Sequence, residues 1–362
     1  MKIAYVAEWN AYVESGVLRK IHAQVLAWAS EHEVELFLIS LKRRGARPLE
    51  DAAVACTPIG CFSESDRPRP LVNYLNRVVS VPPLRTALRR FRPDLIYYRQ
   101  GIWFPGFVSV LRSCAPYVVE INTSPDESRL AGRLTHAFKL WGGALQLRNA
   151  SGIVCPTEEL ARGCRRFGKP VAVVSNGFDT RSVSPTRAPG NARPALILVG
   201  SPDQGWHGVD KLEALAGSLP EFDFHVVGPR DGSGAHPKNL HFHGPRGADE
   251  LAALYARSDV GIGTLALHRK AMREAAPLKV REYIAYGLPV IVGYTDVDLN
   301  GFDCVLDIGN HENNVREAVG RIRDFVAAWK DVRVEDPAVR ANIDSSAKER
   351  DRLRFLAEVA GG

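Results

Sequence analysis

The chain has 362 residues, of which 45% are hydrophobic and 24% charged, and its formal net charge is +6. This length exceeds what one ordinary core accommodates and predicts two domains of roughly 150–200 residues each. The composition is that of a soluble globular protein, and no low-complexity tract or internal repeat is present.

No apolar run approaches the length that a bilayer-spanning helix needs. The first eight residues, Met1 to Glu8, are too short and too soon interrupted for a secretory signal, so we expect a strand there. The six cysteines are scattered, without a C-x-x-C pair or a histidine at zinc spacing. We therefore expect no metal site, free thiols and a reducing cytoplasm.

The first half of the chain alternates short apolar stretches with stretches of helical spacing. We expect a helix over Gly16–Ser30 and strands over Lys2–Ala7, Val34–Ile39, Leu95–Tyr98, Tyr117–Ile121, Gly152–Cys155 and Val171–Val174. Strands that alternate with helices predict a parallel sheet covered by helices. We assign residues 1–182 to this first domain.

Positive charge is concentrated in the first half. Residues 1–185 contain 25 Lys and Arg against 16 Asp and Glu. From Arg67 to Arg92 there are seven arginines and no acidic residue, interleaved with leucines and valines. Such a basic amphipathic stretch fits peripheral contact with an anionic membrane or an acidic acceptor; arginines on the solvated face of an ordinary helix are the alternative. Nucleic acid fits poorly, because no aromatic-interleaved basic strand or zinc module accompanies the charge.

Two places in the first domain have residues suited to a ligand. Gly16 starts a helix soon after a strand, where a glycine lets the backbone approach a ligand and Ser15 is placed to cap the helix; a plain turn is the alternative. Glu120 and Asn122 lie at the carboxyl end of a strand, where ligands of open α/β sheets collect. A turn-capping role for Asn122 is the alternative there.

The segment 183–194 is rich in proline and small residues and is the expected linker. The alternation restarts behind it, with a strand over Ala195–Gly200, a glycine-bearing loop and a helix over Val209–Leu219. The loop is not G-x-G-x-x-G, so binding of NAD through that fingerprint is unsupported. We assign residues 195–340 to the second domain.

The most informative stretch covers residues 273–293. Pro277 suits the first position of a helix, and the Gly-Leu-Pro sequence at 287–289 ends that helix before an apolar strand. In such a helix the backbone N–H groups of Leu278 and Lys279 have no intrahelical partner and lie at the positive end of the helix dipole. This arrangement predicts a phosphate site.

Two carboxylates flank this expected phosphate site. Glu274 lies just before it, and Glu282 lies more than a turn inside the helix. One is placed to meet a sugar on the far side of a diphosphate, and the other to meet the hydroxyls of a ribose on the near side. The alternative is a plain surface helix with two solvated glutamates, since glutamate is common in helices.

These residues resemble the donor-site motif of the retaining family 4 glycosyltransferases, which have the GT-B fold. The motif here is Glu274, seven residues and Glu282, with Pro-Leu-Lys between them and Glu-Tyr-Ile-Ala-Tyr-Gly-Leu-Pro-Val-Ile closing it. The resemblance implies an α/β fold of two Rossmann-like parallel-sheet domains that face each other across a cleft. It also implies that the terminal helix at 341–362 packs back on the first domain.

The resemblance assigns roles to the residues of the motif. It implies that Glu274 contacts the donor sugar, that Glu282 holds the ribose, and that the segment Pro277, Leu278 and Lys279 carries the diphosphate. Glu274 and Lys279 are therefore the expected catalytic residues.

The resemblance also assigns contacts outside the motif. It implies that Gly16 faces the donor diphosphate, that Gly200 belongs to the donor-binding loop, and that Gly244 contacts the nucleotide base. Related enzymes often have a histidine beside the reacting sugar, and the residues near that place here are Glu120 and Asn122. We assign these two to the acceptor or the sugar.

The chain departs from the resembled family in the loop after Gly200. The family usually supplies an Arg and a Lys there, which neutralise the diphosphate, whereas the matching positions here are Ser201 or Pro202 and His207. We expect the positive charge to come from one of the remaining candidates, Lys279, Arg230, Arg273 or a protonated His207.

We therefore expect a hexosyl- or N-acetylhexosaminyltransferase that moves a sugar from a UDP- or GDP-sugar to an acceptor hydroxyl with retention of configuration, without metal or cofactor. The acceptor is expected to be sugar-bearing, lipid-linked or a small molecule. We expect the enzyme in the cytoplasm, at the inner face of the membrane. Two alternatives remain, a catalytically silent subunit that binds a nucleotide sugar and a sugar-nucleotide epimerase of the same fold.

Overall fold

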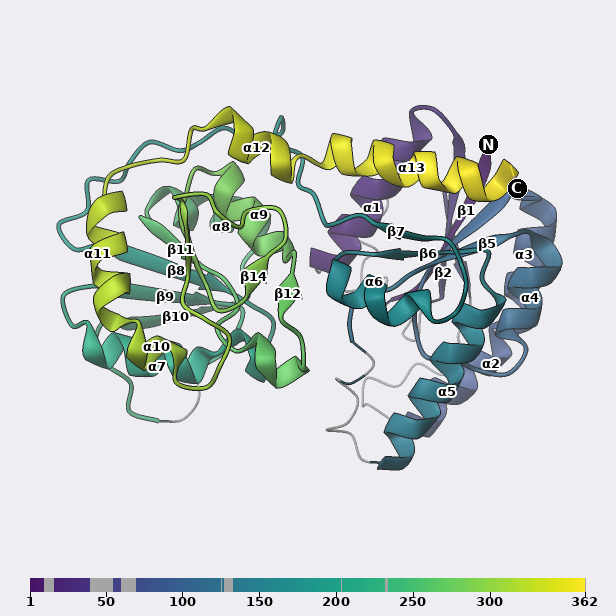
Figure 1. Ribbon diagram of the computed structural model, residues 1–362, viewed down its shortest axis with the longest axis horizontal. Coiled ribbons are helices and arrows are strands. Elements are labelled where there is room, and N and C mark those ends of the chain that lie inside the picture. The colour runs from purple at the N-terminus through teal and green to yellow at the C-terminus, as the bar shows by residue number, and fades with distance from the viewer. Residues whose placement is uncertain are drawn as a thin grey trace. The chain divides into compact units, whose positions relative to one another are not determined.

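The computed structural model describes residues 1–9, 16–39, 55–59, 70–124, 126, 133–202, 204–231 and 234–361 (Figure 1). The expected cap Ser15 and two of the arginines, Arg67 and Arg69, lie outside the described residues. The chain divides into two compact units. Unit 1 consists of Met1–Val174 with Lys348–Gly362, and unit 2 consists of Ser175–Ala347.

The division falls after residue 174, ahead of the linker expected at 183–194. The residues that follow it belong to unit 2 because their polar groups bond there. The Ser175 hydroxyl donates to Asp298 Oδ1 over 2.8 Å, and the Thr186 N–H donates to the carbonyl oxygen of Tyr286 over 2.9 Å. The segment 183–194 is an irregular part of the chain attached to unit 2.

Unit 1 contains a parallel sheet in the order β3-β2-β1-β4-β5-β6-β7. Its strands are β1 (Lys2–Glu8), β2 (Glu33–Ile39), β3 (Cys56–Ile59), β4 (Leu95–Arg99), β5 (Tyr117–Glu120), β6 (Gly152–Cys155) and β7 (Val171–Val173). Its helices are α1 (Gly16–Ala29), α2 (Pro70–Val79), α3 (Val81–Phe91), α4 (Phe107–Cys114), α5 (Arg133–Asn149), α6 (Glu158–Arg165) and most of α13 (Ser345–Gly361). The central strands are apolar and buried on both faces, as a parallel sheet covered by helices requires.

An aromatic cluster forms the core of unit 1. Trp28 of α1 packs against Tyr5 and Tyr97, with ring centroids 5.6 and 5.0 Å away. The terminal helix α13 reaches this core, because Glu349 accepts a hydrogen bond of 2.8 Å from Trp28 Nε1. Arg352 of the same helix is fully buried and pairs with Glu349. The last helix is therefore part of the core of unit 1.

Unit 2 repeats the alternation of strands and helices. Its parallel sheet has the order β10-β9-β8-β11-β13-β15. The strands are β8 (Ala195–Val199), β9 (Asp223–Val227), β10 (Leu240–Gly244), β11 (Val260–Ile262), β13 (Val290–Val292) and β15 (Val305–Asp307), and β12 (Glu274–Ala275) pairs with β14 (Thr295–Asp296). The helices are α7 (Val209–Ser218), α8 (Ala248–Ala256), α9 (Leu278–Ala285), α10 (Asn314–Glu317), α11 (Val319–Trp329) and α12 (Pro337–Ile343), with short 3₁₀ turns η2 (Gly205–His207) and η3 (Leu267–Lys270).

Both units thus consist of a parallel sheet with helices, and the predicted α/β fold class of two Rossmann-like domains is confirmed. Within the described residues, every helix is too short or too polar to cross a membrane. The same residues contain no group of three His, Cys, Asp or Glu side chains placed to hold a metal ion.

Candidate functional site

The expected donor residues of unit 2 gather where its strands end. Gly200 directly follows β8, Arg230 lies exposed after β9, and Gly244 is the last residue of β10. The Gly200 N–H donates to the carbonyl oxygen of Val227 over 2.9 Å, and the Gly228 N–H donates to that of Gly244 over 2.8 Å. These residues therefore lie at the carboxyl edge of the sheet, where ligands of α/β folds bind.

The imidazole of His207 lies against Gly200. A Cβ atom at residue 200 would approach His207 Cδ2 to 2.7 Å, so the position needs a glycine. His207 Nε2 accepts a hydrogen bond of 3.1 Å from the Ser201 N–H, and the residue is 9% exposed. Burial, and then the charges of Lys279 and Lys270, lower the pKa of His207 to about 2. His207 is therefore a neutral hydrogen-bonding residue, and the protonated form considered from the sequence is disfavoured.

Gly200→Ala is expected to lower the free energy of unfolding by about 1–3 kcal/mol, because the new methyl group would force the buried ring of His207 or the end of β8 to move. Urea denaturation measures the change. Gly217→Ala is the matched control, since a Cβ there meets nothing within 4 Å. Equal stability of the two variants would contradict the close packing of His207.

Lys279 contacts the other nitrogen of the same ring. Its Nζ lies 3.3 Å from His207 Nδ1, and burial lowers the pKa of Lys279 to about 7. Because Nε2 accepts the Ser201 N–H, the proton of the neutral ring is on Nδ1, which donates toward Nζ. Only an uncharged amine has the lone pair to accept that bond. The geometry and the lowered pKa therefore agree on a Lys279 that exchanges its proton near neutral pH.

The helix α9 begins at Leu278, and Pro277 is its N-cap, with φ −69° and ψ 137°. The sequence prediction had begun the helix at Pro277, one residue before it begins in the structure. The N–H groups of Leu278 and Lys279 occupy the first turn, where no intrahelical acceptor exists. Gly287, at φ +87°, ends the helix as expected.

A buried ion network beneath α9 fixes the direction of the helix, and sequence reasoning missed it. Arg281 is fully buried and donates to both Asp296 and Asp298, with 2.8 Å from Nη2 to Asp296 Oδ1. Its Nε also donates to the carbonyl oxygen of Asn176 over 3.2 Å. The sequence does hold one indication of this network. Arg281 directly follows Val280 and lies on the side of the helix that its apolar residues occupy.

A second contact ties α9 to the strand edge. The Tyr283 hydroxyl accepts a hydrogen bond of 2.7 Å from the N–H of Val199, the last residue of β8. A side chain at residue 261 would approach the Tyr283 ring to 2.4 Å, so Gly261 makes room for it. The contact thereby holds α9 against the carboxyl end of β8.

Glu274 and Glu282 lie on the two elements that flank Pro277. Glu274 is in β12 and pairs in register with Thr295, and Glu282 is on α9. Both side chains are partly buried. Their placement agrees with the spacing argument, and their roles remain predictions.

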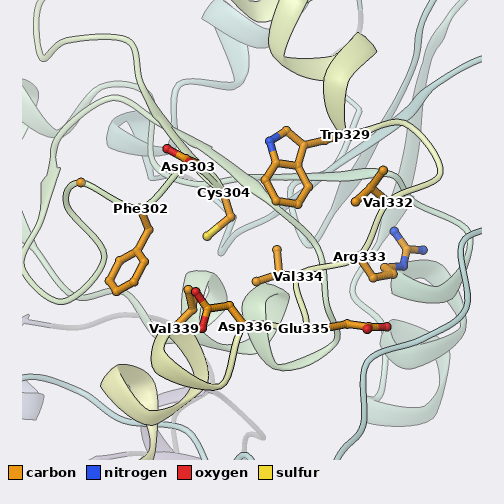
Figure 2. A pocket seen from close by; sticks show the side chains of 11 residues that line it. Phe302, Asp303, Cys304, Trp329, Val332, Arg333, Val334, Glu335, Asp336 and Val339 are labelled. Carbon is orange, nitrogen blue, oxygen red and sulfur yellow. The ribbon is translucent and has the colours of Figure 1, made fainter.

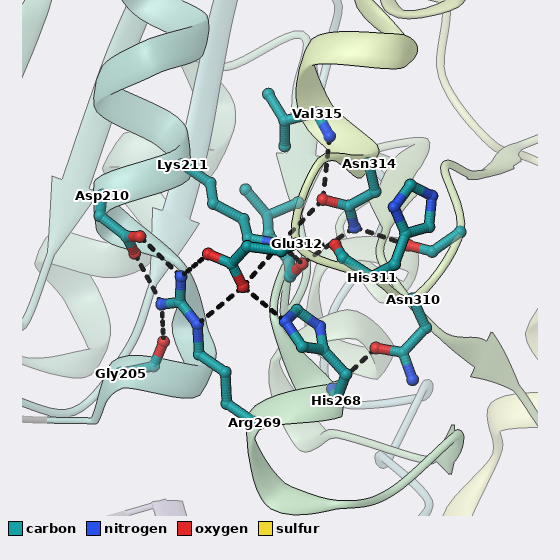
Figure 3. A network of polar contacts seen from close by, with 12 residues as sticks. Gly205, Asp210, Lys211, His268, Arg269, Asn310, His311, Glu312, Asn314 and Val315 are labelled. Carbon is teal, nitrogen blue, oxygen red and sulfur yellow. Dashed lines mark hydrogen bonds and ion pairs between the residues drawn. The ribbon is translucent and has the colours of Figure 1, made fainter.

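A polar network braces the turn that carries His207 (Figure 3). Arg269 of η3 donates to the carbonyl oxygen of Gly205 over 2.9 Å and pairs with Asp210 over 2.7 Å. Its Nη2 also pairs with Glu312, so three separate segments meet at one guanidinium. Lys211 is buried beside them and donates to the carbonyl oxygen of His311 over 2.7 Å. The network makes η2 a rigid support for the site.

In unit 1, the expected residues Glu120 and Asn122 belong to a buried cluster of charged and polar side chains. Glu120 is 2% exposed and accepts from Lys20 Nζ at 2.8 Å and from Arg99 Nη1 at 3.1 Å. Burial alone raises the pKa of Glu120, but the two cations lower it to well below its usual range. Lys20 Nζ also donates to Asn122 Oδ1 over 3.3 Å. Glu120 therefore positions Lys20 beside Asn122, and its expected contact with the acceptor or the sugar stays a prediction.

Asn122 and Gly16 are the other expected residues of unit 1. The Asn122 Nδ2 atom is buried and has no hydrogen-bond partner among the described residues. Gly16 is the first residue of α1, and a Cβ there meets nothing within 4 Å. Asn122 therefore has a donor to offer, and Gly16 leaves open space at the start of a helix.

A cavity of about 430 Å³ in unit 2 lies away from these residues (Figure 2). It is lined by Cys304, Trp329 and Arg333, among others, and residues 301–304 lead into the amino end of β15. None of the expected site residues lines it. The candidate site is therefore the strand edge around Gly200, His207 and α9.

Comparison with known proteins identifies the class to which the chain belongs. The profile of Glycosyltransferase Family 4 matches residues 15–182, and that of Glycosyl transferase-like proteins matches residues 209–358. No curated protein sequence matches the chain. Sucrose-phosphate synthase from Thermosynechococcus elongatus is similar in structure, with a TM-score of 0.78 and 14% identity over 99% of this chain and 98% of that one.

Two further structures are similar over nearly their full lengths. Anabaena HepE, solved in complex with UDP-glucose, has a TM-score of 0.67 and 14% identity, covering 99% of this chain and 100% of that one. TarM has a TM-score of 0.69 and 9% identity, covering 100% and 99%. The fold and the site define a glycosyltransferase of the GT-B fold. The chain belongs to the glycosyltransferases, with the family 4 model matching its first domain, in agreement with the resemblance.

Proposed function

We propose that the protein transfers a sugar from a nucleotide-diphosphate sugar to an acceptor hydroxyl with retention of configuration. The proposal rests on one observation. The N-terminus of α9, with Lys279, and the strand edge at Gly200 lie together, on either side of the His207 ring. A UDP-sugar is the first donor to test, because HepE is similar in structure and was solved with UDP-glucose. A GDP-sugar is the second.

Different residues of unit 2 bind the diphosphate, the ribose and the sugar of the donor. The first-turn N–H groups of Leu278 and Lys279, with the Lys279 ammonium, stabilise the negative charge of the departing diphosphate. Glu282 holds the ribose and Glu274 the transferred sugar. Because the helix and Lys279 supply the positive charge, we propose that the reaction needs no metal and no cofactor.

The remaining contacts are proposed from the strand edge and from unit 1. Gly200 and Gly244 let the backbone approach the nucleotide, and the exposed Arg230 lies beside them. Gly16 faces the diphosphate, and Asn122 donates to the acceptor or the sugar. The acceptor is sugar-bearing, lipid-linked or a small molecule of polysaccharide, glycoconjugate or natural-product biosynthesis. Attack from the same face as the leaving group accounts for retention.

Glu282→Ala is expected to abolish the thermal stabilisation that UDP gives to the wild-type protein, because the ribose loses its carboxylate partner. A ligand at a hundred times its Kd stabilises a protein by about 2.7 kcal/mol, so the loss is measurable by differential scanning fluorimetry. Glu317→Ala, an exposed helical glutamate of unit 2, is the matched control. An unchanged shift in Glu282→Ala would remove the ribose role.

The departure at Ser201 and His207 favours one alternative, a subunit that binds the nucleotide sugar without transferring it. The two functions differ in turnover. Release of sugar from radiolabelled UDP-glucose, with anomeric analysis of the product by NMR, reports transfer and its stereochemistry. A silent subunit would show UDP binding, no sugar release, and no difference between wild type and Glu274→Ala. An epimerase would return a different nucleotide sugar without an acceptor.

A further inference from the structure

Six of the eight large hydrophobic side chains that are exposed in the described part of the chain lie on two helices of unit 1. Helix α2 exposes Leu71, Leu75 and Val79, and helix α5 exposes Leu134, Phe138 and Trp141. Leu134 is 88% exposed and Leu71 is 72% exposed. We call these six residues the α2–α5 apolar face. A monomeric protein rarely leaves such a cluster uncovered without a role for it.

The two stripes are one continuous surface. On each helix the three residues follow one another at spacings of three or four, so they share one side of the helix. Helices α2 and α5 lie side by side (Figure 1). The Tyr74 and Phe138 rings join them, with centroids 5.9 Å apart. Trp103 packs on Trp141 at 4.7 Å and lies so close to α5 that a Cβ at Gly142 would approach it to 2.5 Å.

The helices that form and adjoin the α2–α5 apolar face carry charge of a single sign. Helices α2, α3 and α5 contain seven Lys and Arg residues and no Asp or Glu. Arg133 and Lys139 are exposed within the same turns of α5 as the exposed apolar residues. A partner for this surface must therefore tolerate apolar side chains and carry negative charge.

This combination decides between the kinds of partner. A second copy of the chain packed on this face would bring two basic surfaces together, and like charges disfavour association. Nucleic acid supplies negative charge but offers no place for aliphatic side chains such as Leu71 and Leu134. The interface of an anionic bilayer supplies both, because acyl chains accept the apolar side chains and phosphates accept the cations.

We propose that the α2–α5 apolar face is an interfacial docking surface for a bilayer that contains anionic lipid. The sequence predicted such a contact between Arg67 and Arg92, and the present proposal keeps helix α2 of that stretch and adds helix α5. Leu88 of α3 is fully buried, and Arg77 of α2 pairs with Glu8. Helix α5, outside the expected stretch, supplies half of the surface. The proposal is independent of the transfer chemistry.

Flotation of the full chain with vesicles tests the surface. We expect binding to phosphatidylcholine vesicles that contain phosphatidylglycerol, little binding to phosphatidylcholine alone, and weaker binding at high salt. Leu134→Glu and Val79→Glu are each expected to reduce binding by about tenfold or more. Val332→Glu is the matched control, because Val332 is 44% exposed in unit 2, as Val79 is in unit 1.

A second measurement guards against a folding defect. Each variant is first shown to unfold at the wild-type temperature. Anionic vesicles are expected to shift the tryptophan emission of the wild type to shorter wavelength, and Trp141→Phe is expected to lose part of that shift while still floating with the vesicles. Equal binding by Val79→Glu and Val332→Glu, or no wild-type binding to anionic vesicles, overturns the proposal. A lipid-free dimer that Leu134→Glu dissociates also overturns it, in favour of self-association.

Discussion

Replacing Arg281 with methionine is expected to lower the free energy of unfolding by about 3–5 kcal/mol. The fully buried guanidinium is the shared partner of Asp296 and Asp298, and it also donates to the Asn176 carbonyl oxygen. Removing it leaves buried carboxylate charge without its partner, which costs far more than the pair contributes. Urea unfolding followed by circular dichroism measures the loss.

Two companion variants separate this mechanism from a simple change of volume. Arg165→Met breaks a pair with Glu158 whose side chains are about half exposed, and we expect a much smaller change there. Adding Asp296→Asn and Asp298→Asn to Arg281→Met removes the stranded charge and is expected to recover part of the stability. If Arg281→Met behaves like Arg165→Met, the network does not hold α9 in place.

The fold was predictable because its signals are local. Short apolar strands alternate with helical stretches in both halves, and Gly287 ends α9 by the positive φ that a glycine adopts easily. The helix start at Pro277 could be predicted to within one residue. The spacing of Glu274 and Glu282 around it also depends on neighbours in sequence, so both carboxylates could be placed next to the helix start, while their roles toward the donor stay predictions.

What the sequence could not predict depends on partners far along the chain. Glu120 pairs with Lys20, which is 100 residues away in the sequence. No residue near Glu120 in the sequence indicates this pairing. From the sequence, His207 was a candidate for the positive charge that neutralises the diphosphate. In the structure its ring is buried against Gly200. Burial sets the protonation of such a group, and a sequence does not show burial at a single loop position.

The affinity for UDP-glucose is expected to fall as pH rises above about 7, because Lys279 must be an ammonium to bind the diphosphate. Burial holds its pKa at about 7 in the free protein, and His207, the titratable group in contact with it, stays neutral in this range. The diphosphate favours the charged form, so the pKa rises on binding. Affinity is then full below the free pKa and declines by up to tenfold per pH unit above it. UDP-glucose is the probe because its diphosphate ester does not titrate in this range.

Two substitutions of Lys279 test whether its charge causes this pH dependence. Lys279→Met is expected to weaken UDP-glucose binding by about 10–100-fold at acidic pH, the range for a lost hydrogen bond to a charged group. Lys279→Arg keeps a charge that does not titrate, so it should retain binding and flatten the pH profile. Calorimetry at about pH 8 in buffers of different ionisation enthalpy should show proton uptake in the wild type and none in Lys279→Arg. A profile that declines equally in both would assign the titration to another group, and the pairing of Lys279 with His207 would then have no part in charge neutralisation.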